Sequence, residues 1–135
     1  MNPYPKWWSD IVYFKPHEFN SGKEKHSGAH GMNEEFVRKL DSLRSLYRKP
    51  MIVTSGYRSM ERHKAIYKEL GKEPPMGSMH LYGRAADILV AGKDALHLIG
   101  LAYDMGFSVG VSQNGDWGER FIHLDNRENQ TMWSY

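Results

Sequence analysis

The chain has 135 residues, of which 40% are hydrophobic and 25% charged, so we predict one domain over residues 1–135 with its own core. A formal net charge of +2, without a dense run of Lys and Arg among aromatics, does not favour nucleic acid as a partner. The absence of cysteine excludes disulfides and thiolate metal sites, and no apolar run is long enough to cross a membrane.

Residues 1–32 form a largely irregular N-terminal segment in this prediction. Two prolines stand near its start, and a stretch rich in Gly, His, Lys and Ser runs from Asn20 to Gly31. The first residues lack the charged region and apolar run of a signal peptide. We therefore expect synthesis in the cytoplasm, with any action outside the cell depending on another route of release.

A helix is predicted between Asn33 and Pro50. Asn33 can cap its start, Glu34 and Glu35 suit the positive end of the helix dipole, and Pro50 stops it. Five apolar residues at helical spacing share one face: Phe36, Val37, Leu40, Leu43 and Tyr47.

The remaining elements alternate between strands and helices. In chain order they are a buried strand at Met51–Ser55, a helix from about Ser59 to Leu70, a strand at Arg84–Val90, a helix at Asp94–Met105, and strands at Phe107–Ser112 and Arg120–Asp125. The helix at Asp94–Met105 is amphipathic, with Leu96, Ile99 and Tyr103 on its apolar face. This mixed order predicts an α+β domain with a small, largely antiparallel sheet flanked by helices.

Three side chains suited to metal binding lie in these ordered stretches. His80 precedes one predicted strand, Asp87 lies within it, and His123 lies in the last strand. Two imidazoles and one carboxylate can hold a catalytic zinc and leave a fourth position open for water. By spacing alone, ordinary roles stay open as well: a turn cap for His80, a salt bridge for Asp87 and a core position for His123.

The sequence around these residues resembles a known family. Ser78-x-His80-x-x-Gly83-x-Ala85-x-Asp87, followed by a strand ending in His123-x-Asp125, resembles the zinc D-alanyl-D-alanine metallopeptidases, which share a fold with the hedgehog signalling domain. Three further segments resemble that family and its short phage and bacterial members: Tyr13–Phe19, Thr54–Ser59 with its Ser-Gly-Tyr-Arg, and Trp133–Tyr135. The likeness covers roughly residues 13–135.

The resemblance implies roles for particular residues. It implies zinc, Zn2+, at His80, Asp87 and His123. The matching arginine of the family stabilises the substrate carbonyl as it becomes an oxyanion, a role that falls here on Arg58. Ser78 is implied as a substrate contact. Tyr82, between two predicted ligands, is a further substrate-binding candidate.

The general base departs from the family pattern. Members place a Glu three residues before the last His ligand, where this chain has Arg120. Glu119, one residue earlier, needs a bulge or an irregular strand start to reach the same face. Asp125 shares the face of His123 and is a second candidate, although it can instead orient that imidazole. Asp116 is the third candidate.

These features predict a zinc-dependent peptidase that hydrolyses an amide bond in peptidoglycan stem peptides, with an endolysin-like or DD-carboxypeptidase/endopeptidase-like activity. We expect a monomer whose partner is peptidoglycan peptide, without nucleic acid or membrane. The short chain resembles a phage lysin that acts on the cell wall after release, or one carried in a virion. The alternative is a non-catalytic zinc domain that binds cell-wall peptide or a protein partner. Which peptide bond is cut stays open.

Overall fold

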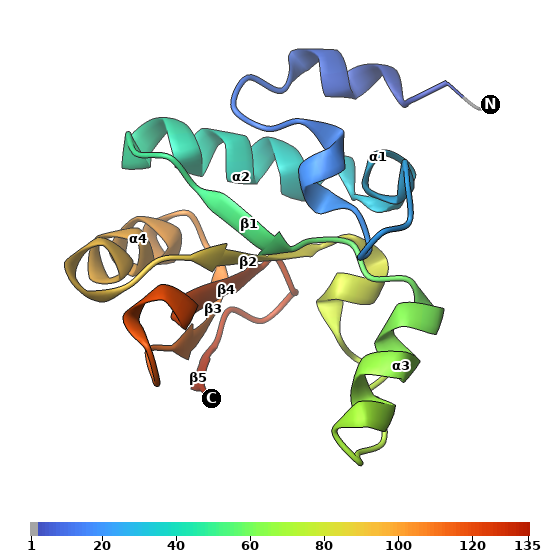
Figure 1. Cartoon of the computed structure of the whole chain (residues 1–135). Coiled ribbons are helices and arrows are strands. Elements are labelled where there is room, and N and C mark those ends of the chain that lie inside the picture. Colours follow the sequence, from blue (N-terminus) through green and yellow to red (C-terminus); the bar gives the residue numbers. More distant parts are fainter. Residues whose placement is uncertain (1–2) are drawn as a thin grey trace.

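A computed structural model describes residues 3–135 and confirms the α+β fold with a largely antiparallel sheet (Figure 1). The five strands are β1 (Ile52–Ser55), β2 (Ala85–Leu89), β3 (Ser108–Ser112), β4 (Phe121–Asp125) and β5 (Met132–Ser134). They lie side by side in the order β1-β2-β4-β3-β5. Neighbours pair antiparallel except β3 and β5, which run parallel. The sequence analysis did not predict β5.

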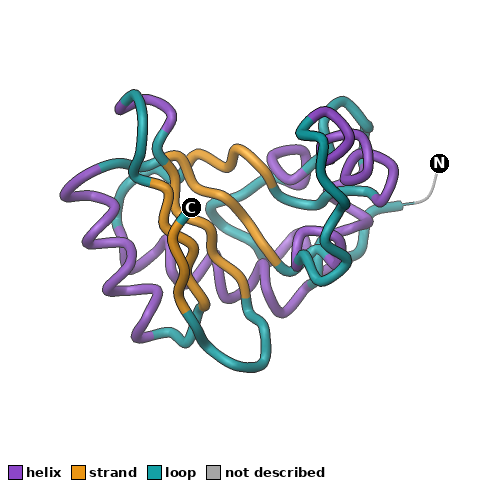
Figure 2. The backbone as a smooth tube through the Cα atoms, turned by 90° about the horizontal axis from the view of Figure 1, so that it is seen from below, coloured by secondary structure: helices purple, strands orange, loops and turns teal. Residues whose placement is uncertain are grey.

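Helices lie on both sides of these strands (Figure 2). The α-helices are α1 (Ser27–Gly31), α2 (Glu34–Tyr47), α3 (Met60–Glu69) and α4 (Gly92–Asp104), and the 3₁₀-helices are η1 (Lys6–Asp10), η2 (Pro16–Phe19), η3 (Met79–Tyr82) and η4 (Trp117–Glu119). Within the described residues, none of them has the length and apolar character that a membrane crossing needs.

Helix α2 forms as its sequence predicts. The Asn33 side chain accepts a hydrogen bond from the backbone N–H of Phe36, 2.9 Å away, and so satisfies a donor that the first turn would leave free. The five predicted apolar residues of α2 are all buried. They pack in the main core with residues from the sheet and α4, and this burial fixes α2 against one face of the sheet.

The predicted apolar face of α4 is wrong for Leu96 and Tyr103, whereas Ile99 is partly buried and packs against the core. Leu96 and Tyr103 are 71% and 68% exposed, whereas Ala95, Leu98 and Ala102 face the core. Apolar residues occupy two neighbouring stripes of this helix, so periodicity alone fits either stripe. The stripe that contains two alanines faces inward, and its small side chains let α4 approach the sheet closely.

Two other predictions need correction. Strand β1 is not a buried strand but an edge strand that pairs only with β2, and its Ile52 is 57% exposed. The N-terminal segment is more regular than predicted, since it contains η1, η2 and α1. It also contributes Trp8 and Phe19 to the core, and the Trp8 indole N–H donates to the carbonyl of Ala29, 2.9 Å away.

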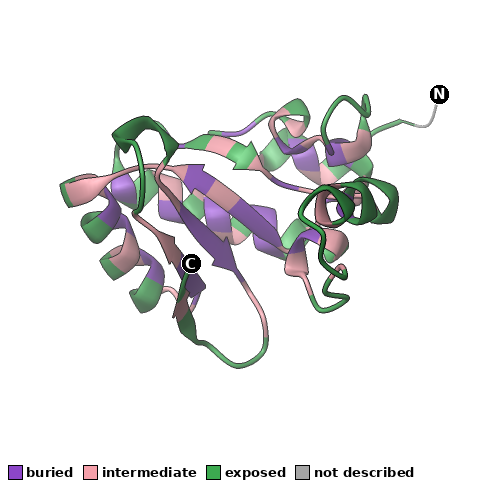
Figure 3. Cartoon of the chain, turned by 60° about the horizontal axis from the view of Figure 1, so that its bottom comes forward, coloured by how far each residue is buried: buried purple, intermediate pink, exposed green. Residues whose placement is uncertain are grey.

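The two faces of the sheet differ in chemistry. One face presents apolar side chains such as Ile88 and Ile122 to the helices, and Figure 3 shows how deeply the central strands are buried. The other face carries one row of directly paired residues that crosses all five strands: Ser55, Asp87, His123, Gly110 and Trp133. Paired residues share a face, so this row brings two predicted metal ligands together.

Candidate metal centre

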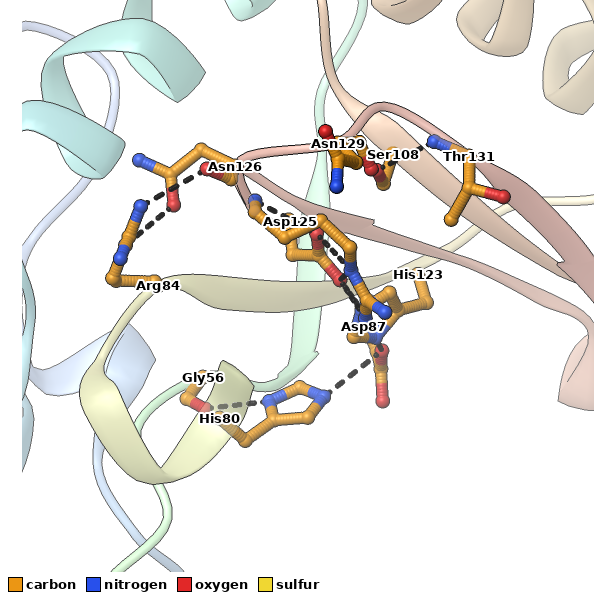
Figure 4. Close-up of polar contacts among 11 residues, drawn as sticks. Gly56, His80, Arg84, Asp87, Ser108, His123, Asp125, Asn126, Asn129 and Thr131 are labelled. Atoms are coloured by element: carbon orange, nitrogen blue, oxygen red, sulfur yellow. Dashed lines mark hydrogen bonds and ion pairs between the residues drawn. The ribbon is translucent and has the colours of Figure 1, made fainter. Parts of the chain in front are cut away.

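The predicted ligands His80, Asp87 and His123 converge on one point, although they come from η3, β2 and β4 (Figure 4). Their ligand atoms all lie within 4.8 Å of one another. Asp87 Oδ1 is 3.3 Å from His80 Nε2 and 2.9 Å from His123 Nδ1. Both histidines are buried, with 4% of each residue exposed, so the three side chains meet in a poorly solvated place.

His80 is oriented by the turn that follows β1. Its Nδ1–H donates to the carbonyl oxygen of Gly56, 2.8 Å away, which leaves Nε2 facing Asp87. The backbone N–H of Arg58 in turn donates to the His80 carbonyl, 3.0 Å away. A Cβ on Gly56 would lie 2.8 Å from the Phe19 backbone, so glycine is needed where the N-terminal segment packs on this turn.

His123 is oriented by a buried carboxylate. Its Nε2–H donates to Asp125 Oδ2, 2.7 Å away, and Nδ1 therefore faces Asp87. Asp125 is completely buried and also accepts three hydrogen bonds from the Arg127 guanidinium, the shortest of 2.6 Å. Burial favours its neutral form, but hydrogen bonds from His123 and Arg127 outweigh burial and bring the pKa of Asp125 to about 2.

The carboxylate of Asp87 is also held in its charged form. Burial opposes the charge, but hydrogen bonds from His123 and His80 hold the pKa of Asp87 well below its usual value. The pKa of His123 moves the other way. Burial lowers it, yet the hydrogen bonds to Asp125 and Asp87 prevail and raise it. The centre therefore favours positive charge at the point where the three side chains meet.

The donor set fits a zinc ion. The Gly56 carbonyl and the Asp125 carboxylate only accept hydrogen bonds, so they place the ring protons on the outer nitrogens of the two histidines. In their neutral forms both rings then direct a lone pair at Asp87, and a cation satisfies all three groups. The separations of 3.3 and 2.9 Å compare with roughly 3.3 Å between ligands of a tetrahedral zinc.

A cleft of about 350 Å³ opens over the three ligands. Beside the ligands it is lined by Arg58, Tyr67, Ser78, Met79, Phe121, Arg127, Trp133 and Tyr135. Trp133 covers the neighbouring Gly110, where a Cβ would lie 2.7 Å from the indole nitrogen, and its ring centroid is 5.1 Å from that of His123. A substrate can therefore reach the centre between an arginine and an aromatic wall.

The family model for peptidase M15 matches residues 12–125. The chain belongs to this family. A solved structure, the L-Ala D-Glu endopeptidase ChiX of Serratia marcescens, is similar at 19% identity and a TM-score of 0.49, covering 71% of this chain and 80% of that one. No curated protein matches the sequence.

The structure brings some predicted residues of this M15 peptidase to the cleft and leaves others outside. Arg58 and Ser78 line it. Tyr82 does not; it is 57% exposed, and its hydroxyl donates to the Met76 carbonyl. Glu119 and Asp116 are exposed on the connection between β3 and β4, and neither belongs to the lining of the cleft. β4 pairs regularly with both neighbours from Phe121 to Asp125 and so contains no bulge, whereas Glu119 ends the 3₁₀-helix η4 just before the strand begins.

Sequence reasoning did not single out five of the residues that line the cleft: Tyr67, Met79, Phe121, Arg127 and Tyr135. His63, which the sequence analysis also did not single out, is fully buried in α3 and contacts Arg58.

Proposed function

We propose that this member of the M15 family is a zinc-dependent peptidase that hydrolyses an amide bond in peptidoglycan stem peptides. One observation carries the proposal: two imidazoles and one carboxylate converge at the floor of a cleft that also contains Arg58. Three protein ligands leave a fourth position of a tetrahedral ion open, as catalytic zinc sites require.

In this proposal the chain's own residues hold the ion and orient the substrate. His80 Nε2, Asp87 Oδ1 and His123 Nδ1 are the ligands. When bound, zinc supplies Lewis acidity for the scissile carbonyl and a water of lowered pKa. Asp125 has the role of orienting His123, which the sequence left open beside that of a base, because its carboxylate is committed to His123 and Arg127.

Arg58 is the proposed stabiliser of the oxyanion. Its side chain lines the cleft, and a guanidinium presents directed N–H donors in a planar fork. Nη2 donates to Ser55 Oγ at 3.3 Å and Nη1 approaches His63 Nδ1 at 3.4 Å, so the group is positioned before substrate arrives. Preorganised donors of this kind stabilise charge that develops on the carbonyl oxygen. Ser78, at the wall of the same cleft, is the proposed substrate contact.

The cell-wall substrate and the site of action are part of the proposal. A peptidase fold with an open cleft, aromatic walls and a mildly basic chain suits the peptides of an anionic wall polymer. We propose action as a monomer on the wall after release from the cell, or from a virion, as phage lysins act. Both carboxypeptidase and endopeptidase action fit a cleft of this kind.

One observation favours the second candidate, a non-catalytic zinc domain that binds cell-wall peptide or a protein partner. Among the described residues, Asp87 is the one carboxylate that lines the cleft, and it serves as a ligand. Glu119, the predicted base, lies outside. A binding domain needs no proton carrier, whereas a peptidase needs one.

Incubation of zinc-loaded protein with purified peptidoglycan separates the two. For the peptidase we expect new amine groups, which should no longer form after chelation of the zinc or in His123→Ala. His97→Ala should retain activity, because His97 is an exposed histidine of α4 and not a predicted ligand. Release of no amines from several wall types, by protein that contains stoichiometric zinc, would support the binding domain instead.

A further inference from the structure

A second, smaller hollow adjoins the metal cleft. It has a volume of about 170 Å³ and a mostly polar lining, formed by Asn20, Ser21, Gly22, Thr54, Ser55, Tyr57, Arg58, Arg62 and Ile66. Arg58 lines both this hollow and the metal cleft, so the two are neighbours across one guanidinium. Ser55, on its wall, is the direct partner of the ligand Asp87 in the sheet. A group bound here would therefore lie beside the reacting amide.

The lining of the hollow contains two arginines and no carboxylate. Neither Arg58 nor Arg62 takes part in an ion pair among residues 3–135, and no carboxylate lines the hollow. Glu24 and Glu61 line an adjoining hollow that shares Ser21, Gly22 and Arg62 with this one, and Glu24 accepts a hydrogen bond from Ser59 Oγ, 2.8 Å away. Two arginines with hydroxyls between them form a typical setting for a carboxylate.

The N-terminal segment orients Arg62. Gly22 adopts a positive φ of 55°, and a Cβ there would lie 3.2 Å from Arg62 Nε, so the guanidinium rests against the glycine backbone. Ser21 is 2% exposed, and its hydroxyl accepts a hydrogen bond from the backbone N–H of Ser59, 3.0 Å away, at the start of α3. These contacts join the segment to the helix that carries Arg62, which makes the hollow a built feature.

We propose that this hollow is a subsite for a carboxylate of the peptide substrate, bound mainly by Arg62 with the hydroxyls of Thr54 and Ser55, while Arg58 separates it from the scissile carbonyl. The proposal rests on the proposed function and adds a requirement on the substrate. A stem peptide offers two such groups, the α-carboxylate of its D-Glu and the carboxylate at its C-terminus. The chemistry is the same for both, and amidation of each in turn distinguishes them.

The test compares three versions of one synthetic stem peptide, L-Ala-γ-D-Glu-L-Lys-D-Ala: unmodified, with the D-Glu α-carboxylate amidated, and with the C-terminus amidated. We expect amidation of the bound carboxylate to lower kcat/KM of the zinc-loaded wild type about 10- to 100-fold. Arg62→Gln should cause a similar loss with the unmodified peptide, and amidation should then have little further effect, as expected when two changes remove one interaction.

Lys64→Gln is the matched control, because it removes one positive charge from the exposed surface of α3 at a position outside the hollow. It should behave as the wild type with all three peptides. Arg62 is exposed, so Arg62→Gln should melt at the wild-type temperature. Full discrimination between carboxylate and amide by Arg62→Gln, or no discrimination by the wild type, would overturn the subsite.

The proposed function can fail separately. If the zinc-loaded wild type cleaves none of the three peptides, the peptidase proposal fails, and calorimetric Kd values for the same intact peptides test the subsite. Tighter binding of a carboxylate than of its amide by the wild type, lost in Arg62→Gln and kept in Lys64→Gln, would support the subsite in a binding domain. Equal Kd values for the three peptides would contradict it.

Discussion

Asp125 determines which nitrogen of His123 faces the metal centre, because its buried carboxylate accepts the Nε2 proton. In Asp125→Asn the amide can donate as well as accept, and Arg127 loses the negative charge of its partner and one of the two accepting oxygens. We expect zinc affinity to fall about 10- to 100-fold, as for other changes behind a metal-bound histidine. The loss of stability should be about 1–2 kcal/mol, less than for a fully buried pair, since the Arg127 side chain is 35% exposed.

Competition with a chromogenic chelator measures the affinity in Asp125→Asn, and denaturant unfolding measures the stability. Asp116→Asn is the control, because Asp116 is an exposed carboxylate on the connection before β4. An unchanged zinc affinity in Asp125→Asn would show that His123 needs no such partner.

His63 holds the arginine of the cleft. It is fully buried in α3, its Nε2–H donates to the Pro75 carbonyl at 2.8 Å, and its Nδ1 is thereby left as the acceptor for Arg58 Nη1. His63→Leu keeps a similar volume and removes both contacts. We expect kcat to fall about 10-fold with little change in KM, because misplacement of an oxyanion donor affects the transition state more than binding.

His63→Asn should recover part of that loss, since its amide oxygen can take the place of Nδ1 near Arg58. Steady-state kinetics with one stem peptide compare the two variants, with melting temperatures as a check on folding. Equal kcat values for His63→Leu and the wild type would mean that Arg58 is positioned without His63.

At the level of elements, η3 must end where it does for His80 to reach the centre. Gly83 closes η3 with a φ of 66°, and a Cβ there would lie 2.0 Å from the carbonyl oxygen of Gly31. Gly83→Ala therefore adds left-handed backbone strain to a backbone clash, and we expect a loss of more than about 3 kcal/mol. Weaker zinc binding should accompany it, because η3 carries a ligand.

Gly100→Ala is the matched comparison and should have the opposite sign. Gly100 lies inside α4, and a Cβ added there would have no neighbour within 4 Å. Alanine is also a better helix former than glycine. We expect a gain of about 0.5–1 kcal/mol. Denaturant unfolding of both variants gives the result. A Gly83→Ala protein as stable as the wild type would show that η3 and the N-terminal segment can separate at low cost.

The elements with strong local signals were predictable from the sequence. Helix α2 has a cap, a single apolar stripe and a stop at Pro50, and each of these is a short-range interaction. The apolar face of α4 was not predictable, because Leu96 and Leu98 are equally apolar and only the shape of the sheet selects Leu98. Strand β5 has three residues and is defined by its partner β3, which no local pattern reveals.

The same difference between local sequence signals and tertiary contacts applies to the metal centre. The three ligands stood out because His80 precedes one predicted strand, Asp87 lies within it and His123 lies within another, and the pairing of Asp87 with His123 then brings two of them together. The environment of His63 depends on the Pro75 loop folding back over α3, a contact across twelve positions that depends on the tertiary fold. The position of Glu119 depends on whether β4 begins with a bulge, and turn residues alone do not decide that.

At the scale of the whole molecule, the three ligands join parts that are distant in the chain, namely η3, β2 and β4. An ion that binds the folded state and not the unfolded chain stabilises the fold by mass action, by about 2.7 kcal/mol at one hundred times its Kd. For a domain of this size we expect zinc to raise Tm by on the order of 10 °C and chelation to reverse the rise.

His123→Ala should abolish this dependence on zinc, whereas His97→Ala should keep it. His97 is exposed on α4 beside Tyr47, so its loss can change Tm without changing the response to metal. Thermal melts of the three proteins with zinc and with chelator measure the difference. A wild type that melts at one temperature in both conditions would mean that His80, Asp87 and His123 hold no ion; the peptidase and the zinc-binding domain would then fail together, because both depend on the same centre.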